Sequence, residues 1–488
     1  MTNSGEGFSP EFDQTGPRPV EPAAKSGASN RGLWPVLAIG GATQFVLNLD
    51  TTIMSVALPQ VQGDLQLNDP ERTSVIAFYV FFHGLFLLLG GRAVDSWGPR
   101  RAFLIGIAGF GVVSMLGGGA SNASELLVAR SAQGSFAALL APAVLALVSN
   151  SFAGKRERAF AFVVIGTTAV FGTASGLVLG GMLAQYASWR WCLLVNVPLA
   201  LLIFYLVLFL LQGGHETGRR GYDLFGSALS IVAFFTLGVG IYHVEAERSR
   251  IPVFLCLALF VVFTWCFVFV EQHAPAPLTP PSVLLDRTCT LASLGNAFTL
   301  SGVLGGTLFL ATYMEKLRGY NPSETGLRLL PILAGILIGG LSVAKLSEWA
   351  GIRALSVVGS LLAATGMLLF SRISPDDDYA TRMLPMITVF GLGLGVLSVC
   401  LPDLALVGVR NSEAGSASAM FTAYGQIGGA LGTAFLSQKY ASAKHFVAEG
   451  GQAAELVGCT TAFFVAGMTL ACVAPVVLFA RPKAGAHP

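Results

Sequence analysis

Long apolar stretches alternate with short polar loops along most of the chain, and this pattern predicts membrane-spanning helices. A helix needs roughly 20 apolar residues to cross about 30 Å of hydrocarbon. Stretches of about this length cover residues 34–58, 74–90, 102–120, 126–148, 159–184, 191–211, 224–244, 251–270, 289–313, 327–345, 354–371, 383–405, 415–438 and 457–480. We therefore expect an all-α integral membrane protein with 14 transmembrane helices.

The composition agrees with a membrane protein. Of the 488 residues, 53% are hydrophobic and 11% are charged, whereas roughly 25% are charged in ordinary soluble domains. A formal net charge of +2 gives no basic surface for nucleic acid. The seven cysteines stand singly, without the paired Cys or His spacing of a zinc or redox site. We therefore expect no metal, no cofactor, no nucleic-acid partner and no enzymatic activity.

The polar residues before the first apolar stretch lack the basic and apolar regions of a cleaved signal peptide. We expect them to form a disordered cytoplasmic tail. With both termini cytoplasmic, a majority of the 29 Lys and Arg residues lie on the inner side of a cell membrane that the chain crosses many times. The predicted domains are a tail over 1–32, a six-helix bundle over 33–212, a linker with two inserted transmembrane helices over 213–288, a second six-helix bundle over 289–480 and a cytoplasmic tail over 481–488.

An internal repeat supports two related bundles. One offset of 253 residues aligns two separate features of the chain. The aligned residues are Asp95 with Glu348, Gly98 with Gly351, Arg100 with Arg353, Gly172 with Gly425, and Gly176 with Gly429. We infer two pseudo-symmetric six-helix bundles, spans 1–6 and 9–14, separated by an inserted helix pair. Parallel repeats of this kind are typical of carriers that work by alternating access.

The stretch "LDTTIMSVALP" places a carboxylate, Asp50, within the first span. A charge near a bilayer centre costs at least about 2.5–3.5 kcal/mol. On an ideal helix with about 100° per residue, Asp50 lies off a polar stripe that could form the wall of a transport path. The stripe consists of Gln44, Asn48, Thr51 and Ser55. Asp50 should therefore face another helix of its own bundle.

Arg130 in span four is the predicted partner of Asp50, because no other basic residue of the first six spans lies as deep. Together they are the candidate proton-coupling residues. The alternatives are a permanent structural ion pair or an arginine that extends to the outer surface. Gln133 on the same face, and His83 in span two, are further candidates for the substrate cavity, although a hydrogen-bonded packing role suits His83 as well.

Two other motifs indicate moving helices. The loop "GGRAVDSWGPRR" brings a carboxylate, glycines and arginines into a tight cytoplasmic turn that could hold two bundles together. A positively charged anchor with a turn is the alternative. The candidate gate residues are Gly91, Asp95, Gly98, Arg100 and Arg101. In span five, Gly172, Gly176, Gly180 and Gly181 form a stripe that lets a neighbouring helix approach closely and slide.

The loop motif resembles the loop 2–3 signature of the major facilitator superfamily. Together with "LDTTIMSVALP", "SWRWCLLVNVP", "YDLFGSALS" and "GYNPSETGLRLLP", it is similar to the 14-helix drug:proton antiporter family. The resemblance implies a proton-coupling role for Arg130 and a sealing role for the span-five glycines. The chain has Leu177 after Gly176, where a proline is usual in the antiporters.

The expected function is secondary active transport by alternating access, with proton-coupled efflux of amphipathic drugs, antibiotics or toxic metabolites. The substitution at Leu177 keeps open a proton-coupled uptake or a lipid or siderophore transporter of the same fold. A non-transporting membrane receptor is a further alternative. The expected partners are a small amphipathic substrate, protons and the lipid bilayer. The oligomeric state stays open, and a monomer is expected to function.

Overall fold

The computed structural model describes residues 33–152, 155–211, 228–229, 231–233, 235–237, 239–240, 250–273, 281–410, 413–445 and 451–480. These residues form helices joined by short loops, and no strand occurs among them. The predicted all-α fold is confirmed. The predicted tails 1–32 and 481–488, and most of the predicted span 224–244, lie outside the described residues.

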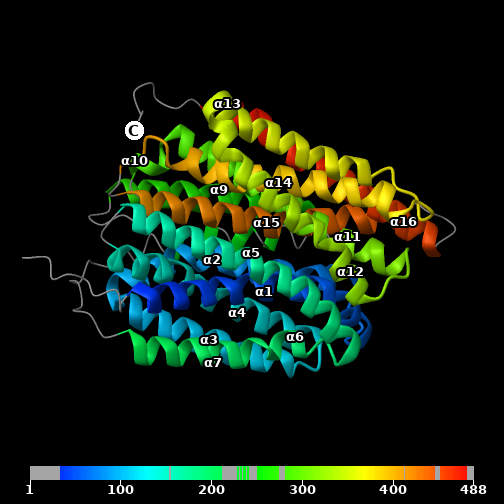
Figure 1. Cartoon of the computed structure of the whole chain (residues 1–488), viewed down its shortest axis with the longest axis horizontal. Coiled ribbons are helices and arrows are strands. Elements are labelled where there is room, and N and C mark those ends of the chain that lie inside the picture. The colour runs from blue at the N-terminus through cyan, green and yellow to red at the C-terminus, as the bar shows by residue number, and fades with distance from the viewer. Residues whose placement is uncertain are drawn as a thin grey trace, which may run out of the picture.

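The first helices of the chain form an amino-terminal group, which occupies the lower part of Figure 1. It consists of α1 (Leu33–Asp64), α2 (Asp69–Trp97), α3 (Pro99–Gly118), α4 (Ala123–Ser151), α5 (Lys155–Tyr186), α6 (Trp191–Leu194) and α7 (Asn196–Leu210). Within this group α1 packs on α5, α2 and α3 pack on α4, and α7 packs on α3. Asn68 begins α2 with a capping box that Glu71 completes, so the polar loop before this helix fixes where the helix starts.

A carboxyl-terminal group occupies the upper part of Figure 1. It consists of α11 (Arg287–Lys316), α12 (Pro322–Leu329), α13 (Pro331–Phe370), the short π-helix η2 (Tyr379–Met383), α14 (Leu384–Leu406), α15 (Ala414–His445), α16 (Gly451–Ala471) and α17 (Val473–Leu478). Between the two groups in sequence come α9 (Arg250–His273) and α10 (Pro281–Leu284). Helix α11 packs on α15 as α1 packs on α5, which agrees with the internal repeat. The exact domain boundaries stay predictions.

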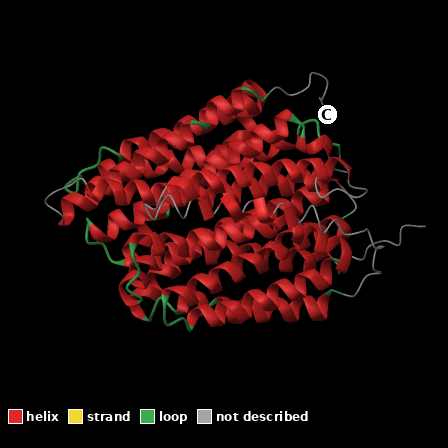
Figure 2. Ribbon diagram, turned by 180° about the vertical axis from the view of Figure 1, so that it is seen from behind, coloured by secondary structure: helices red, strands yellow, loops and turns green. Residues whose placement is uncertain are grey.

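The long helices run between two ends of the molecule, which we name after one residue each (Figures 1 and 2). The Asp64 end carries the loops that follow α1, α3, α5 and α11. The Gly98 end carries the loops that follow α2, α4 and α14. Contacts between the two groups are made chiefly by α2 with α15 and by α5 with α12.

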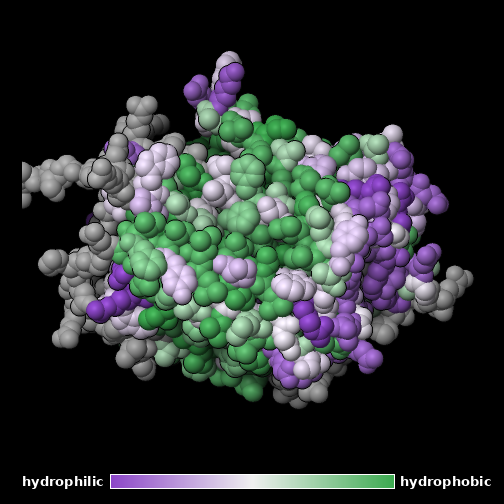
Figure 3. Space-filling view, turned by 60° about the horizontal axis from the view of Figure 1, so that its bottom comes forward, coloured by the Kyte–Doolittle hydropathy of each residue, from purple (hydrophilic) through white to green (hydrophobic). Residues whose placement is uncertain are grey.

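The surface between the two ends is apolar, as a lipid-facing surface must be. Figure 3 shows a hydrophobic band with hydrophilic residues gathered toward both ends. Helix α9 contributes strongly exposed Phe254 and Trp265. Ten helices among the described residues are long and apolar enough to cross a membrane. One of these, over Pro322–Phe370, covers two predicted spans, while α2 and α15 are not among the ten. The predicted count of 14 therefore stays a prediction.

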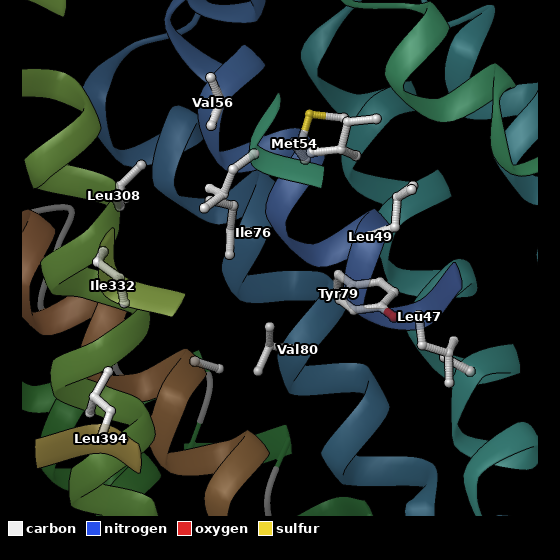
Figure 4. Packing of buried hydrophobic residues seen from close by; sticks show 14 of the residues in the cluster. Leu47, Leu49, Met54, Val56, Ile76, Tyr79, Val80, Leu308, Ile332 and Leu394 are labelled. Carbon is white, nitrogen blue, oxygen red and sulfur yellow. The ribbon is translucent and has the colours of Figure 1, made fainter. Parts of the chain in front are cut away.

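One buried apolar cluster runs through both groups of helices. Figure 4 shows Leu49 and Ile76 of the amino-terminal group and Leu308, Ile332 and Leu394 of the carboxyl-terminal group, all members of this cluster. Within a membrane, apolar side chains of neighbouring helices attract each other by van der Waals packing, which is non-directional. The cluster therefore holds the groups together, while polar contacts must select their relative position.

The internal repeat has a direct structural counterpart at the Gly98 end. Gly98 has φ +83° and ψ 149°, and Gly351 has φ +71° and ψ 153°. Both values of φ lie in the region that favours glycine, and each glycine separates two successive helical segments. Arg100 donates to the carbonyl of Leu208 at 3.0 Å, and Arg353 donates to the carbonyls of Val477 and Leu478. Each arginine therefore binds the end of the last helix of its own group.

The glycine stripe of α5 lies against the backbone of α1. A Cβ atom at Gly172 would stand 2.3 Å from the carbonyl oxygen of Phe45, and one at Gly180 would stand 2.6 Å from that of Ile53. A Cβ at Gly176 would meet the hydroxyl of Thr52 at 2.0 Å. The two helices thus approach each other at a distance that no side chain on α5 would permit.

Replacing Gly172 by alanine tests this close approach. We expect Gly172→Ala to lower the melting temperature of the purified protein, because overpacking costs about 1–3 kcal/mol. Gly166→Ala in the same helix is the matched control, since a Cβ there would meet no atom within 4 Å. Helix propensity makes that change neutral or stabilising by up to about 1 kcal/mol. Equal melting temperatures for the two variants would contradict the packing described.

Candidate functional site

Asp50 lies at the centre of α1 and is fully buried. Its Oδ2 accepts a hydrogen bond from Arg130 Nη1 at 2.8 Å, which is also an ion pair. Its Oδ1 accepts from Gln133 Nε2 at 2.9 Å and from Asn196 Nδ2 at 2.6 Å. All three partners are N–H donors, an arrangement that suits an ionised carboxylate.

Arg130 of α4 is also fully buried and connects α1 with α2. Its Nη1 donates to Gln133 Oε1 at 2.6 Å as well as to Asp50, and its Nε donates to the backbone carbonyl of Val75 at 3.1 Å. Its guanidinium carbon lies 4.4 Å from the centre of the Tyr79 ring. Its Nη2 is buried without a hydrogen-bond partner. The charge thus points into the bundle and does not extend to the surface.

The complete set of residues around the ion pair, which we call the Asp50 cluster, comes from five helices. It consists of Asp50 of α1, Val75 and Tyr79 of α2, Ser114 of α3, Arg130 and Gln133 of α4, and Asn196 of α7. Ser114 Oγ joins it by accepting from Gln133 Nε2 at 2.8 Å. Asn196, Ser114 and Tyr79 were missing from the sequence-based site. The one sequence signal for these three residues was the amide of Asn196, which stands at the start of the strongly apolar α7.

The chemistry of the cluster follows from its burial and its charge. A buried ion pair is sustained only when the remaining polar atoms are also hydrogen-bonded, because desolvation of each ion is costly. One carboxylate and one guanidinium leave the cluster neutral. Addition of a proton to Asp50 would give it a net positive charge and remove the charged acceptor of Arg130. The proton-coupling role of this pair stays a prediction.

The predicted stripe of α1 is half-buried, unlike Asp50 beside it. Gln44, Asn48, Thr51 and Ser55 all belong to this intermediate class. Several of their side chains donate hydrogen bonds to backbone carbonyls of α1. Thr51 Oγ1, for example, donates to the carbonyl oxygen of Leu47 at 2.9 Å. The stripe and Asp50 thus lie on different sides of one helix, and a side-chain hydrogen bond between Thr51 and Tyr79 links the stripe to the Asp50 cluster.

The remaining cavity candidates lie apart from the stripe. The structure places Gln133 in the Asp50 cluster, where it is buried and bonded to both charges. His83 of α2 is buried, its Nε2 has no hydrogen-bond partner, and its ring centre lies 6.1 Å from that of Tyr79. The assignment of these residues to a substrate cavity stays a prediction.

The gate residues surround the turn between α2 and α3. A Cβ at Gly91 would meet no atom within 4 Å. Arg101 is exposed, and Arg100 binds the end of α7. The side chain of Asp95 lies outside the described part of the structure. The bonds of Arg100 stay within the amino-terminal group, so the latch between two bundles stays a prediction.

Gly181 differs from the other glycines of its stripe, because it faces the carboxyl-terminal group. A Cβ there would stand 2.3 Å from the carbonyl oxygen of Pro322 in α12. The contact is reciprocal, since a Cβ at Gly326 of α12 would stand 2.1 Å from the carbonyl oxygen of Leu177. The backbones of α5 and α12 thus touch at the Asp64 end, next to the position where the antiporters usually have proline.

Comparison with known proteins supports a transporter. A sequence model described as the Major Facilitator Superfamily matches residues 41–433. The puromycin resistance protein pur8 of Streptomyces alboniger is 40% identical over 423 residues, which are 86% of this chain and 84% of that protein. The lincomycin resistance protein of Streptomyces lincolnensis is 32% identical over 84% of this chain and 85% of its own length.

Solved structures show the same fold at low sequence identity. A peptide transporter POT in complex with sulfate has a TM-score of 0.66 and 15% identity, with 93% of this chain and 96% of that chain covered. The nucleoside transporter NupG has a TM-score of 0.64 and 10% identity, with 91% and 99% covered. These likenesses support the fold alone.

A double-mutant cycle tests the ion pair. Removing one partner of a buried pair leaves an uncompensated charge and costs about 3–5 kcal/mol. We therefore expect Arg130→Met to lower the melting temperature in detergent more than the combination of Arg130→Met with Asp50→Asn does. Arg382→Met, at an arginine that is 64% exposed, is the control and should change little. If the double variant is the least stable of the set, the two residues do not act as a pair.

Proposed function

The chain belongs to the Major Facilitator Superfamily, and from this membership we propose that it exports amphipathic antibiotics or toxic metabolites in exchange for protons. Relatives named for puromycin and lincomycin resistance, and the cephamycin export protein CmcT of Amycolatopsis lactamdurans at 32% identity, support export. The chain is a multi-pass membrane transporter and not an enzyme. In the proposed arrangement both termini are cytoplasmic and a monomer is sufficient.

The single observation that carries this proposal is the division of α1 into two polar surfaces. Asp50 is buried among donors within one group of helices, whereas the stripe with Asn48 and Thr51 is half-buried. An antiporter needs a site that binds a proton and a site that binds the substrate, coupled but not identical. A single helix that carries both can transmit a change at one to the other.

The contacts between the groups support alternating access. The backbone contact of Gly181 with Pro322 and that of Gly326 with Leu177 both lie at the Asp64 end. Lys444 of α15 also donates to Asp69 of α2 there, at 3.4 Å. With cytoplasmic termini, the Asp64 end faces outward, and this conformation is closed to the outside.

The proposed cycle follows from the chemistry of the Asp50 cluster. When the outer side is open, a proton binds Asp50 and weakens its attraction to Arg130. The neutral carboxyl favours closure of the Asp64 end, and substrate then binds from the cytoplasm while the proton leaves. The N–H donors around Asp50 are the surroundings that the ionised carboxylate needs after proton release in this cycle. Substrate on the stripe completes the cycle by favouring the outward-open state.

Transport in everted membrane vesicles tests coupling. We expect vesicles with an acidic interior to accumulate labelled puromycin, and we expect dissipation of the pH gradient to stop this accumulation. Asp50→Asn should reduce accumulation to background, because the proton site is lost. Asp376→Asn, at an exposed carboxylate in the loop after α13, is the control and should transport normally. Uptake by Asp50→Asn at the native rate would contradict the assignment.

A matched pair of threonines tests the substrate surface. Thr51 and Thr365 each donate to the carbonyl four residues earlier, but Thr51 lies on the stripe and Thr365 is exposed on α13. We expect Thr51→Val to change the relative resistance to different antibiotics, by up to about tenfold for a compound that binds the hydroxyl. Thr365→Val should leave the ranking of inhibitory concentrations unchanged. An identical ranking for Thr51→Val would remove Thr51 from the substrate surface.

A further inference from the structure

Arg72 of α2 is a second buried arginine, and it reaches across to the other group of helices. It is fully buried, and its guanidinium carbon lies 6.0 Å from the ring centre of Phe309 and 5.7 Å from that of Tyr440. Its Nη1 donates to Thr312 Oγ1 at 3.4 Å. Its Nε and Nη2 are buried without hydrogen-bond partners. Phe309, Tyr440 and Thr312 all belong to the carboxyl-terminal group.

A carboxylate of the carboxyl-terminal group complements Arg72 incompletely. Glu315 of α11 interacts electrostatically with Arg72, but burial opposes its charged form and no ion pair within 4.0 Å joins the two. Its Oε1 is buried without a hydrogen-bond partner. Lys444 lies nearby and bonds both Asp69 and Glu455, at 3.4 and 2.7 Å. The other charged groups around Arg72 are Asp69 of α2, Lys316 of α11 and Glu455 of α16.

The buried position of Arg72 is only weakly favoured, because two of its N–H donors lack hydrogen-bond partners. Buried donors that lack partners cost about 1–3 kcal/mol, and more when charged. The attraction of Glu315 and of the two aromatic rings opposes that cost. If the Asp64 end opens, water satisfies the guanidinium and both attractions are lost. The buried and the released positions of Arg72 therefore differ little in free energy. A small displacement of α2 can shift the equilibrium between them.

The Asp50 cluster can displace α2 in this way, because it is bonded to α2 one helical turn after Arg72. Arg130 Nε donates to the carbonyl of Val75, three residues after Arg72. Arg130 also lies over the ring of Tyr79, one further turn along α2. When Asp50 is neutral, it offers Arg130 a weaker, uncharged acceptor. The bonds of Arg130 to Val75 O and Gln133 Oε1 then carry more of its charge, so its hold on α2 strengthens.

We propose that Arg72 is the positioning residue through which the Asp50 cluster controls closure of the Asp64 end. A neutral Asp50 strengthens the bond between Arg130 and the backbone of α2, and this draws Arg72 into its position between Phe309 and Tyr440. Ionisation of Asp50 weakens that hold, so that Arg72, which is still buried in the closed conformation described here, leaves when the Asp64 end opens. The inference rests on the proposed function, since it takes Asp50 as the residue that changes its protonation.

Distance measurements between spin labels test this proposal in the full-length protein. Labels at Ala187→Cys and Asp376→Cys are both at exposed loop positions of the Asp64 end, one on each group of helices. The native cysteines that are not buried, Cys256, Cys266 and Cys472, are replaced by alanine. Electron–electron distance distributions then give the ratio of closed to open molecules.

The decisive comparison is the effect of Asp50→Asn, which imitates the protonated carboxyl, in two backgrounds. With Arg72 present we expect Asp50→Asn to raise the ratio of closed to open molecules about fivefold. With Arg72→Met we expect a lower starting ratio and no further change on adding Asp50→Asn. Glu315→Gln, which keeps the side-chain shape, should reduce the effect in the same way if Arg72→Met folds poorly.

Thr73→Val is the matched control within α2. Thr73 shares a hydrogen bond of 2.6 Å with Ser437 of the other group, so this change removes a contact between groups without touching Arg72. The effect of Asp50→Asn should persist in it. An equal effect of Asp50→Asn with and without Arg72 would overturn the proposal and leave the proposed function standing. No effect of Asp50→Asn in the native background, together with native transport, would overturn both.

Discussion

The buried ion pair of Asp50 and Arg130 is the constraint on which the amino-terminal group depends. Two charges removed from water are tolerated only if their geometry is good and their other polar atoms are bonded. Val75, Gln133 and Asn196 bond the two charges and Ser114 bonds Gln133, so that Arg130 Nη2 is the one polar atom of the pair without a partner. Each of these residues lies on a helix that must therefore keep its position. In the proposed cycle the same requirement makes the group respond to a single proton, because the added charge would disturb contacts on several helices at once.

The two groups are held by forces of different kinds, and this difference allows movement. A continuous apolar cluster crosses the interface and gives attraction without a strongly preferred position. Glycines at the contact of α5 with α12 permit backbones to touch, while Arg72, Asp69 and Lys444 add charge contacts at the Asp64 end. Polar contacts at one end can therefore be exchanged while the apolar contact is partly retained, as alternating access requires.

The sequence predicted local and periodic features well. Helix periodicity separated Asp50 from the polar stripe and led to Arg130 as its partner, and the structure contains that contact. The offset of 253 residues aligned Gly98 with Gly351, whose backbone angles agree. Features that depend on tertiary packing were not accessible. Gln133 was predicted in the substrate cavity and bonds Asp50, and Asn196 stood out only as an amide at the start of an apolar helix. Arg72 gave no signal that distinguished it from neighbouring polar residues.

In the proposed cycle, substrate binding from the cytoplasm releases the proton from Asp50. The most direct test is the pH change when an amphipathic substrate such as puromycin is added to the purified protein in weakly buffered detergent solution. We expect substrate to release protons from the native protein and to release none from Asp50→Asn, which should still bind the substrate. Undiminished proton release from Asp50→Asn would contradict competition between substrate and proton at Asp50.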